Sequence, residues 1–289
     1  MRKLERFIKT AGVYFLGNVF TKLISFLLLP LYTNRIPPND YGAYGLVLSL
    51  TNLLIPLGFF QIWDSIFRFT FDYEKKDGKY KIISNGFAVM LMGALVYTWG
   101  FLGFSVIFDF EYKALIFLYS LSIGIQYFYN YVARSFQNNS LFVISGSINS
   151  FLTIVINIVL IVFLKKGVDS LYISPIIGIL VQVLIIEYRM KILKNVKLQY
   201  VSKKDIKELI KFSAPLSINT VSHWLLTGLT QLAISVKLGS YENGLFTVAN
   251  KFSSMLVLLV GIFQFAWNEM AYSLSSSENK KEYYERSIT

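Results

Sequence analysis

Cysteine is absent from the 289-residue sequence, and histidine occurs once, at His223. Disulfides, thiolate nucleophiles and cysteine-bound metals are therefore excluded, and a single imidazole cannot build a multi-histidine metal site. Charged residues are also scarce, at 16%, where a soluble domain carries about a quarter. Hydrophobic residues make up 54%. These absences predict a membrane protein that is not an enzyme and that holds no metal or cofactor.

Long apolar runs account for the hydrophobic excess. Each run is close to the roughly 20 residues that a membrane-spanning helix needs, whereas the strands of a membrane β-barrel are about ten residues long and polar at every second position. The predicted fold is therefore all-α, a polytopic membrane protein of about eight transmembrane helices. The predicted spans are residues 11–32, 41–63, 82–108, 114–133, 141–164, 171–186, 212–236 and 244–267.

Lysine and arginine are concentrated in alternate connections between these spans. The set of connections that includes the amino terminus holds 21 of them, and the other set holds 5. Because positive residues accumulate on the cytoplasmic side of a membrane, this asymmetry predicts a cytoplasmic amino terminus. The net charge of +11 then reflects topology and attraction to anionic phospholipids, and no nucleic-acid partner is expected.

A sequence pattern near the amino terminus returns 202 residues later. The first copy is a short basic amphipathic helix followed by an apolar span, and Gly42 in the next span maps onto Gly244 at the same offset. Six predicted spans separate the copies, which gives them the same orientation, as in transporters built from parallel repeats. The paired positions of the amphipathic face are Leu4, Phe7, Ile8 and Ala11 with Ile206, Leu209, Ile210 and Ser213.

This repeat predicts a two-lobe architecture. We expect a six-helix amino-terminal lobe over residues 1–190, a basic cytoplasmic linker with an amphipathic helix over 191–211, and an incomplete carboxy-terminal lobe over 212–289. The second lobe would hold only two spans, so the sequence predicts a truncated, split or incompletely represented gene product. If the product is split, a partner chain supplies the missing half.

Short segments in a recurring order carry a resemblance to a known family. Together they resemble the Wzx-type oligosaccharide flippases of O-antigen and capsule synthesis, members of the MOP superfamily that also holds MATE multidrug exporters. The segments are Asn39-Asp40-Tyr41-Gly42-Ala43-Tyr44, Asp64-Ser65-Ile66-Phe67-Arg68-Phe69, Ala133-Arg134-Ser135-Phe136-Gln137-Asn138, Phe212-Ser213-Ala214-Pro215-Leu216 and Gly244-Leu245-Phe246-Thr247-Val248-Ala249-Asn250-Lys251.

The resemblance implies two helical bundles around a cavity that opens alternately to either side of the membrane. It also implies that the substrate is an oligosaccharide on undecaprenyl pyrophosphate, for lipopolysaccharide or capsule assembly with other membrane proteins of that pathway. Many members carry an Asp-Arg pair late in the seventh span, where this chain has Thr230 and Gln231. A cavity charge pair that the family leads us to expect is therefore missing.

Polar residues within the apolar spans are the candidates for substrate contact. An unpaired charge at the membrane centre costs on the order of 2.5–3.5 kcal/mol, so Lys22, with Asn18 one turn before it, is expected to face a cavity or a structural partner. Gln126, Asn130 and Arg134 follow one another at four-residue steps and form a second candidate stripe.

Two further sites are less specific. Lys251 in the eighth span either faces the cavity or extends to the headgroups. Asp64 and Arg68 are four residues apart at the end of the second span, a spacing that predicts a salt bridge on one helix face, with a structural role or a role in gating.

The leading functional hypothesis is therefore the flipping of a lipid-linked oligosaccharide by alternating access. The alternatives are a MATE-like drug or metabolite exporter, an inactive or split flippase fragment, and a membrane glycosyltransferase, for which the outer connections leave little room.

Replacing the lysine that corresponds to Lys22 with alanine in a full-length homologue is expected to reduce surface polysaccharide, because a cation facing the pyrophosphate would be lost. Surface polysaccharide is measured at equal protein expression. An unchanged amount would contradict the assigned role.

Overall fold

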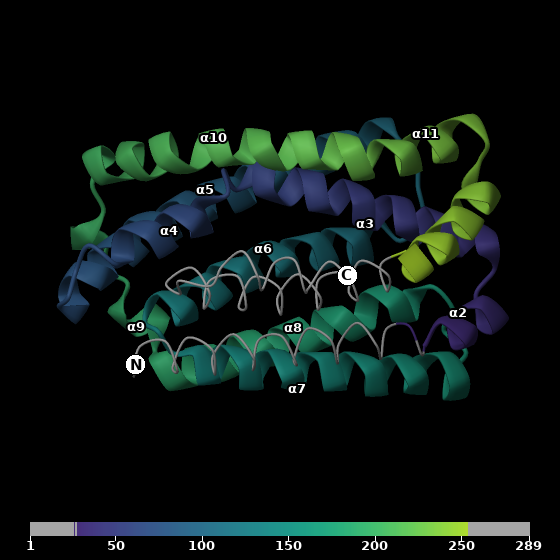
Figure 1. Ribbon diagram of the computed structural model, residues 1–289, viewed down its shortest axis with the longest axis horizontal. Helices are drawn as coiled ribbons and strands as arrows, with labels where there is room; N and C mark the ends of the chain where they lie inside the picture. Colours follow the sequence, from purple (N-terminus) through teal and green to yellow (C-terminus); the bar gives the residue numbers. More distant parts are fainter. Residues whose placement is uncertain (1–25, 27, 254–289) are drawn as a thin grey trace, which may run out of the picture. The chain divides into compact units, whose positions relative to one another are not determined.

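The computed structural model describes residues 26 and 28–253, and within this part all regular elements are helical (Figure 1). Two compact units divide the chain, Met1–Thr247 and Val248–Thr289, and the helices α2 to α11 belong to the first. The predicted all-α fold is confirmed. The helices are α2 (Leu29–Arg35), α3 (Pro38–Gly58), α4 (Ile62–Thr70), α5 (Lys76–Ile107), α6 (Lys113–Ser135), α7 (Asn139–Ile158), α8 (Asp169–Met190), α9 (Ile192–Asn195), α10 (Lys203–Thr227) and α11 (Leu229–Lys237).

Four of the described helices are long and apolar enough to cross a membrane. They are α3, α5, α8, and α7 with the π-helical turn Val159–Phe163 that continues it. The predicted fourth span lies in α6, and the predicted seventh is divided at Gly228 between α10 and α11. These two regions are helical but fall short of the same measure of length and apolar composition.

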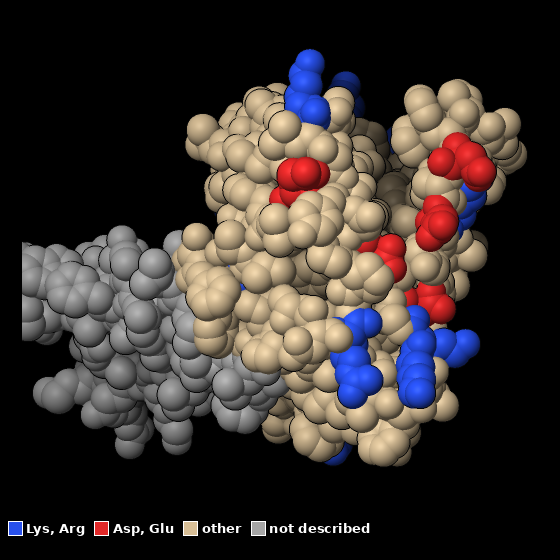
Figure 2. Space-filling view, turned by 90° about the vertical axis from the view of Figure 1, so that its right-hand side faces the viewer, with Lys and Arg blue, Asp and Glu red and all other residues tan. Residues whose placement is uncertain are grey.

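The charge asymmetry coincides with opposite ends of the helical bundle. In Figure 1, α9 lies at the left end, and α2 and α11 lie at the right. Fourteen lysines and arginines between residues 68 and 211 lie in the connections and the adjoining helix ends at the α9 end, against five between residues 35 and 237 at the other. Figure 2 shows that other end, where acidic groups lie among the few basic ones. The cytoplasmic assignment of the α9 end stays a prediction.

The predicted second span is broken rather than continuous. The helix α3 ends at Gly58 and α4 begins at Ile62, with Phe60 and Gln61 in the left-handed backbone region at φ 52° and 47°. This conformation is costly for residues with a Cβ atom. The amide of Gln61 donates to the carbonyl of Pro56 at 2.8 Å, which closes the end of α3 in the manner of a helix carboxy-terminal cap.

The packing of the Phe59 ring between α5 and α6 stabilises this break. Phe59 is fully buried, and its ring fills the space beside Gly124 of α6, where a Cβ atom would lie 2.8 Å from the ring. On α5, a Cβ atom at Gly93 would lie 2.9 Å from the Cα of Phe59. Two glycines therefore allow α5 and α6 to enclose the break, and Phe59 joins the main hydrophobic core at this level.

The second amphipathic segment is not a separate interfacial helix. Residues 206–213 form part of α10, which runs without interruption from Lys203 to Thr227 and so crosses the predicted boundary between linker and second lobe. Leu209 is 1% exposed, and its carbonyl accepts a hydrogen bond from the Ser65 hydroxyl at 2.6 Å. The apolar face packs on protein because α4 and α5 offer it an apolar surface. The lobe boundaries themselves stay a prediction.

Two glycines that the repeat pairs are in reciprocal contact. A Cβ atom at Gly42 would meet the carbonyl of Ser240, and a Cβ atom at Gly244 would meet the carbonyl of Pro38. Ser240 lies 202 residues after Pro38, the same offset that relates Gly42 to Gly244. Each glycine therefore contacts the repeat equivalent of the residue that the other glycine contacts, as across a two-fold axis. Asn243 adds a hydrogen bond to the Gly42 carbonyl at 2.7 Å. This reciprocity supports the predicted repeat.

Gly42→Ala is expected to lower the free energy of unfolding by about 1–3 kcal/mol, because overpacking at a close backbone crossing forces the helices apart. The measurement is the thermal or denaturant midpoint in detergent, followed by near-ultraviolet circular dichroism. Gly100→Ala is the matched control, since a Cβ atom there meets nothing within 4 Å. Equal midpoints for the two variants would contradict the close crossing.

Candidate functional site

A polar cluster joins α4, α6 and α10 next to the helix break. The Gln61 amide donates to the Asp64 carboxylate at 2.7 Å, and the Gln61 carbonyl accepts from the Thr220 hydroxyl at 2.8 Å. From α6, the Tyr131 hydroxyl and the Arg134 guanidinium also interact with Asp64. The break therefore turns Gln61 into a bridge between a half-buried carboxylate and the first helix of the predicted second lobe.

Aromatic rings line the same region. Trp63 stacks on Tyr127, with ring centroids 4.7 Å apart and planes at 22°, and Tyr131 lies one turn further along α6. Tyr127, Tyr131 and Arg134 occupy one face of α6 because they are spaced by four and three residues. Trp63 itself is buried at 3% exposure, whereas Tyr127 and Tyr131 are partly exposed and can present ring faces and hydroxyls.

The Arg134 guanidinium packs against aromatic rings and attracts Asp64 without forming an ion pair with it. Its guanidinium carbon lies 5.0 Å from the ring centroid of Phe67, 5.2 Å from that of Tyr131 and 5.7 Å from that of Phe142. Across the described part of the chain, no hydrogen bond or ion pair engages its N–H groups. Cation–π contacts fix the plane of the group, which leaves its donor fork available for a phosphate or for sugar oxygens.

The other members of the predicted α6 stripe belong to a network of amides. Gln182 of α8 is 2% exposed; its oxygen accepts from Gln126 at 2.7 Å and from Asn149 at 2.8 Å, and its nitrogen donates to Asn130 at 2.8 Å. These bonds join α6, α7 and α8 at a depth where an unpaired amide is costly. The structure therefore separates Gln126 and Asn130 from Arg134, and substrate contact by the two amides stays a prediction.

The predicted salt bridge between Asp64 and Arg68 is wrong. Arg68 pairs with Asp72 at 2.6 Å, and both side chains are about half exposed. Both carboxylates are four residues from Arg68, so sequence spacing alone does not choose between them. The choice follows from Gln61 and Tyr131, which hold Asp64 on the α6 side. A gating role for Asp64 or Arg68 stays a prediction.

Three predicted site residues are not among those that form this cluster in the described part of the first unit. Asn18 and Lys22 are outside the described residues. Lys251 belongs to the second compact unit, in a helical segment over residues 240–253, and its role stays a prediction. Among the described residues, no group of three or more acidic, histidine or cysteine side chains is placed to hold a metal ion.

Sequence reasoning did not single out Gln61, Tyr127, Tyr131 or Thr220. A signal existed for the tyrosines, which share a helical face with Arg134. For Gln61 and Thr220 none was available, because they meet only through the helix break and lie 159 residues apart.

Comparison with protein families and solved structures places this geometry in context. The family model described as polysaccharide biosynthesis protein matches residues 7–267. Comparison with curated protein sequences gives no significant match.

Several solved transporters share the fold. An inward-facing multidrug resistance MATE family transporter of the MOP superfamily has a TM-score of 0.65 at 17% identity, over 85% of this chain and 60% of that one. A MATE protein in complex with Br-NRF gives 0.62 at 17% identity, over 87% and 64%. A MATE protein in complex with MaL6 gives 0.61 at 15% identity, over 95% and 75%. The fold is that of a multi-pass membrane transporter, and this chain spans 60% and 64% of the first two.

Gln182→Leu is expected to lower the free energy of unfolding by about 1–3 kcal/mol, because it leaves three amides on α6 and α7 without their common partner. The denaturant midpoint in detergent measures the effect. Gln199→Leu is the matched control, since Gln199 is exposed. If both variants unfold at the wild-type midpoint, the network does not hold the helices together.

Proposed function

We propose, from the premise that the chain belongs to the polysaccharide biosynthesis protein family, that it acts in moving a lipid-linked oligosaccharide across the bacterial cytoplasmic membrane. The movement proceeds by alternating access and supplies cell-surface polysaccharide. The observation that carries the proposal is the family match over residues 7–267 on a chain with the fold of a membrane transporter. No bond is made or broken in this function.

The cluster around Arg134 supports the proposal chemically. A sugar linked to undecaprenyl pyrophosphate carries hydroxyls and negative charge, which are costly to bring into hydrocarbon without partners. Arg134 offers unpaired N–H donors, Asp64 offers a carboxylate for hydroxyl groups, and Tyr127 and Tyr131 offer ring faces and hydroxyls. We infer that pyrophosphate contacts Arg134 while the first sugar rings lie against the tyrosines.

The position of the cluster supports a role in capture. It lies near the α9 end of the bundle, where α4 and α6 carry their last basic residues. In the proposed topology this end is cytoplasmic, the side from which a lipid-linked sugar bound for the cell surface would enter the transporter. Because Gln61 accepts a hydrogen bond from Thr220, a shift of Gln61 on substrate binding would be transmitted to α10.

The second candidate is a MATE-like exporter of drugs or metabolites. It is favoured by the solved neighbours, which include a multidrug resistance MATE family transporter and MATE proteins in complex with Br-NRF and with MaL6. A lipophilic cation would then interact with Asp64 and the aromatic rings, and Arg134 would oppose it. The chain spans 60% of the length of the first of these transporters. That it completes a transport cycle, alone or with a partner chain, is therefore part of what we propose.

Arg134→Gln is expected to weaken binding of an undecaprenyl-pyrophosphate-linked oligosaccharide about tenfold or more, the equivalent of one charge-assisted contact of roughly 1.5–3 kcal/mol. Arg134→Lys should recover only part of the loss, because lysine keeps the charge but lacks the planar fork. Binding to the full chain in lipid nanodiscs is measured from the change in tryptophan fluorescence, since Trp63 lies against Tyr127.

Arg68→Gln is the matched control, because Arg68 pairs with Asp72 on the exposed side of α4, and its affinity should equal that of wild type. Ethidium serves as the competing probe. Binding of ethidium without binding of the lipid-linked sugar would favour the exporter. Equal affinities of all arginine variants for the lipid-linked sugar would show that Arg134 does not contact it.

A further inference from the structure

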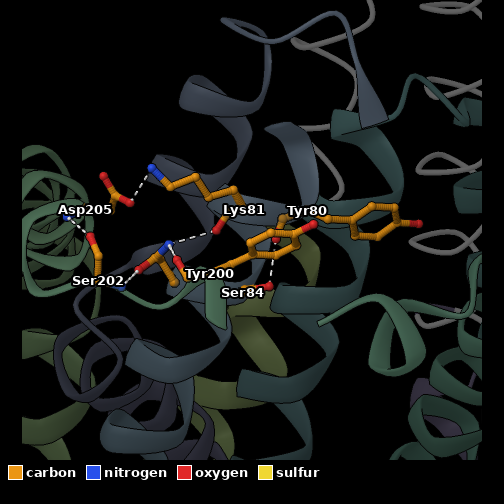
Figure 3. A network of polar contacts seen from close by, with 7 residues as sticks. Tyr80, Lys81, Ser84, Tyr200, Ser202 and Asp205 are labelled. Atoms are coloured by element: carbon orange, nitrogen blue, oxygen red, sulfur yellow. Dashed lines mark hydrogen bonds and ion pairs between the residues drawn. The ribbon is translucent and has the colours of Figure 1, made fainter. Parts of the chain in front are cut away.

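The connector between α8 and α10 is fixed to α5 by buried side chains (Figure 3). The Asn85 amide nitrogen donates to the Tyr200 carbonyl at 2.8 Å, and its oxygen accepts from the Ser202 amide at 2.8 Å. One turn earlier on the connector, the amide of Lys197 donates to the Ser84 hydroxyl at 3.1 Å. Asn85 and Ser84 are fully buried. The predicted linker is therefore an ordered element with a defined outer face.

The acidic groups of this region are used internally. Lys81 and Asp205 form an ion pair at 2.8 Å, and the hydrogen bond from Lys81 lowers the pKa of the Asp205 carboxyl below its usual range. Glu187 accepts the backbone amide of Leu193 at 3.1 Å and 3.2 Å with its two oxygens. Of the three acidic residues between 187 and 211, Asp205 is neutralised by Lys81, which leaves Glu187 and Glu208 to offset the more numerous surrounding lysines.

The outer face combines unpaired positive charge with exposed apolar groups. Leu198 is 90% exposed, Tyr188 is 81% exposed and Leu193 is 51% exposed. Exposed basic residues alternate with them, and none forms an ion pair with another residue of the described chain. These basic residues are Arg189, Lys191, Lys194, Lys197, Lys203 and Lys204.

We propose that residues 188–204, the connector surface, bind the anionic phospholipid headgroups of the membrane leaflet at the α9 end, with Leu193 and Leu198 at the boundary between headgroups and acyl chains. Basic residues beside exposed apolar ones are typical of segments that lie in a membrane interface, and each lysine near an anionic surface adds attraction. The occupant is the bilayer itself, so the assignment is independent of the transported substrate.

The position of the connector gives this contact a mechanical role. Because Asn85 and Ser84 hold the connector on α5 while Ser202 caps the first turn of α10, a leaflet bound to the connector surface is fixed relative to both helices. The α10 apolar face cannot serve as the anchor, since Leu209 is buried.

The test uses single cysteines, which are unique thiols because the chain has none. An environment-sensitive fluorophore is attached to Leu198→Cys, with Asp77→Cys as the matched exposed control at the same end. The full chain is placed in nanodiscs of phosphatidylcholine with or without phosphatidylglycerol, containing lipids with a quencher at the headgroup boundary. We expect strong quenching at residue 198 only, and more of it with phosphatidylglycerol.

A second variant tests the charge. Lys191→Gln with Lys194→Gln and Lys197→Gln should reduce the enrichment of phosphatidylglycerol that native mass spectrometry detects on the chain, by about fivefold for each lysine, since each contributes about 1 kcal/mol near an anionic surface. A solvent-exposed probe at residue 198 in both bilayers, equal quenching in both, or unchanged enrichment would overturn the assignment. Failure to bind lipid-linked sugar would leave these readouts unaffected.

Discussion

The packing of Phe59 between two glycines is the constraint on which the described site depends. Gly93 and Gly124 leave room for the ring, and the chain turns through two left-handed residues immediately after it. A continuous helix through this point would direct residues 61–64 elsewhere. Because the break is held in place, Gln61 reaches Thr220, and Asp64 faces Tyr131 and Arg134. The energy of a well-filled core thus supports an unfavourable backbone conformation at a polar site.

Backbone carbonyls are the common partners where α10 meets the helices before it. Trp224 donates to the Ser49 carbonyl at 2.8 Å, Ser217 to the Pro56 carbonyl at 3.5 Å, and Ser65 to the Leu209 carbonyl at 2.6 Å. Small hydroxyl side chains allow helices to approach closely and supply hydrogen bonds without bringing charge into the apolar region. The charged groups of the described bundle instead gather at its ends, where water and headgroups can solvate them.

The apolar runs identified most of the helices, because the length of a membrane span and its lack of charge are properties of consecutive residues. The break at Phe60 and Gln61 was not predictable, since neither residue is glycine and the conformation depends on a ring packed against distant helices. The predicted Asp64–Arg68 salt bridge was wrong for a similar reason. Asp64 and Asp72 are both four residues from Arg68, and only tertiary contacts decide which of them it pairs with.

The α6 stripe was correctly predicted to be polar. Its division between an amide network and an arginine packed against aromatic rings could not be predicted, because it depends on Gln182 of α8. Arg134 could be named in advance, its partners could not, and Asn18 and Lys22 remain predictions.

The reciprocal contact at Gly42 and Gly244 has an evolutionary consequence. Matching positions that face each other across a two-fold axis form the kind of interface made by two identical subunits. Such a contact is already complementary in a homodimer, so gene duplication and fusion need not invent a new surface to join the halves. The seam inside this chain has the geometry expected of a contact between two identical subunits, and a substitution tolerated at one glycine is constrained by what stands at the other.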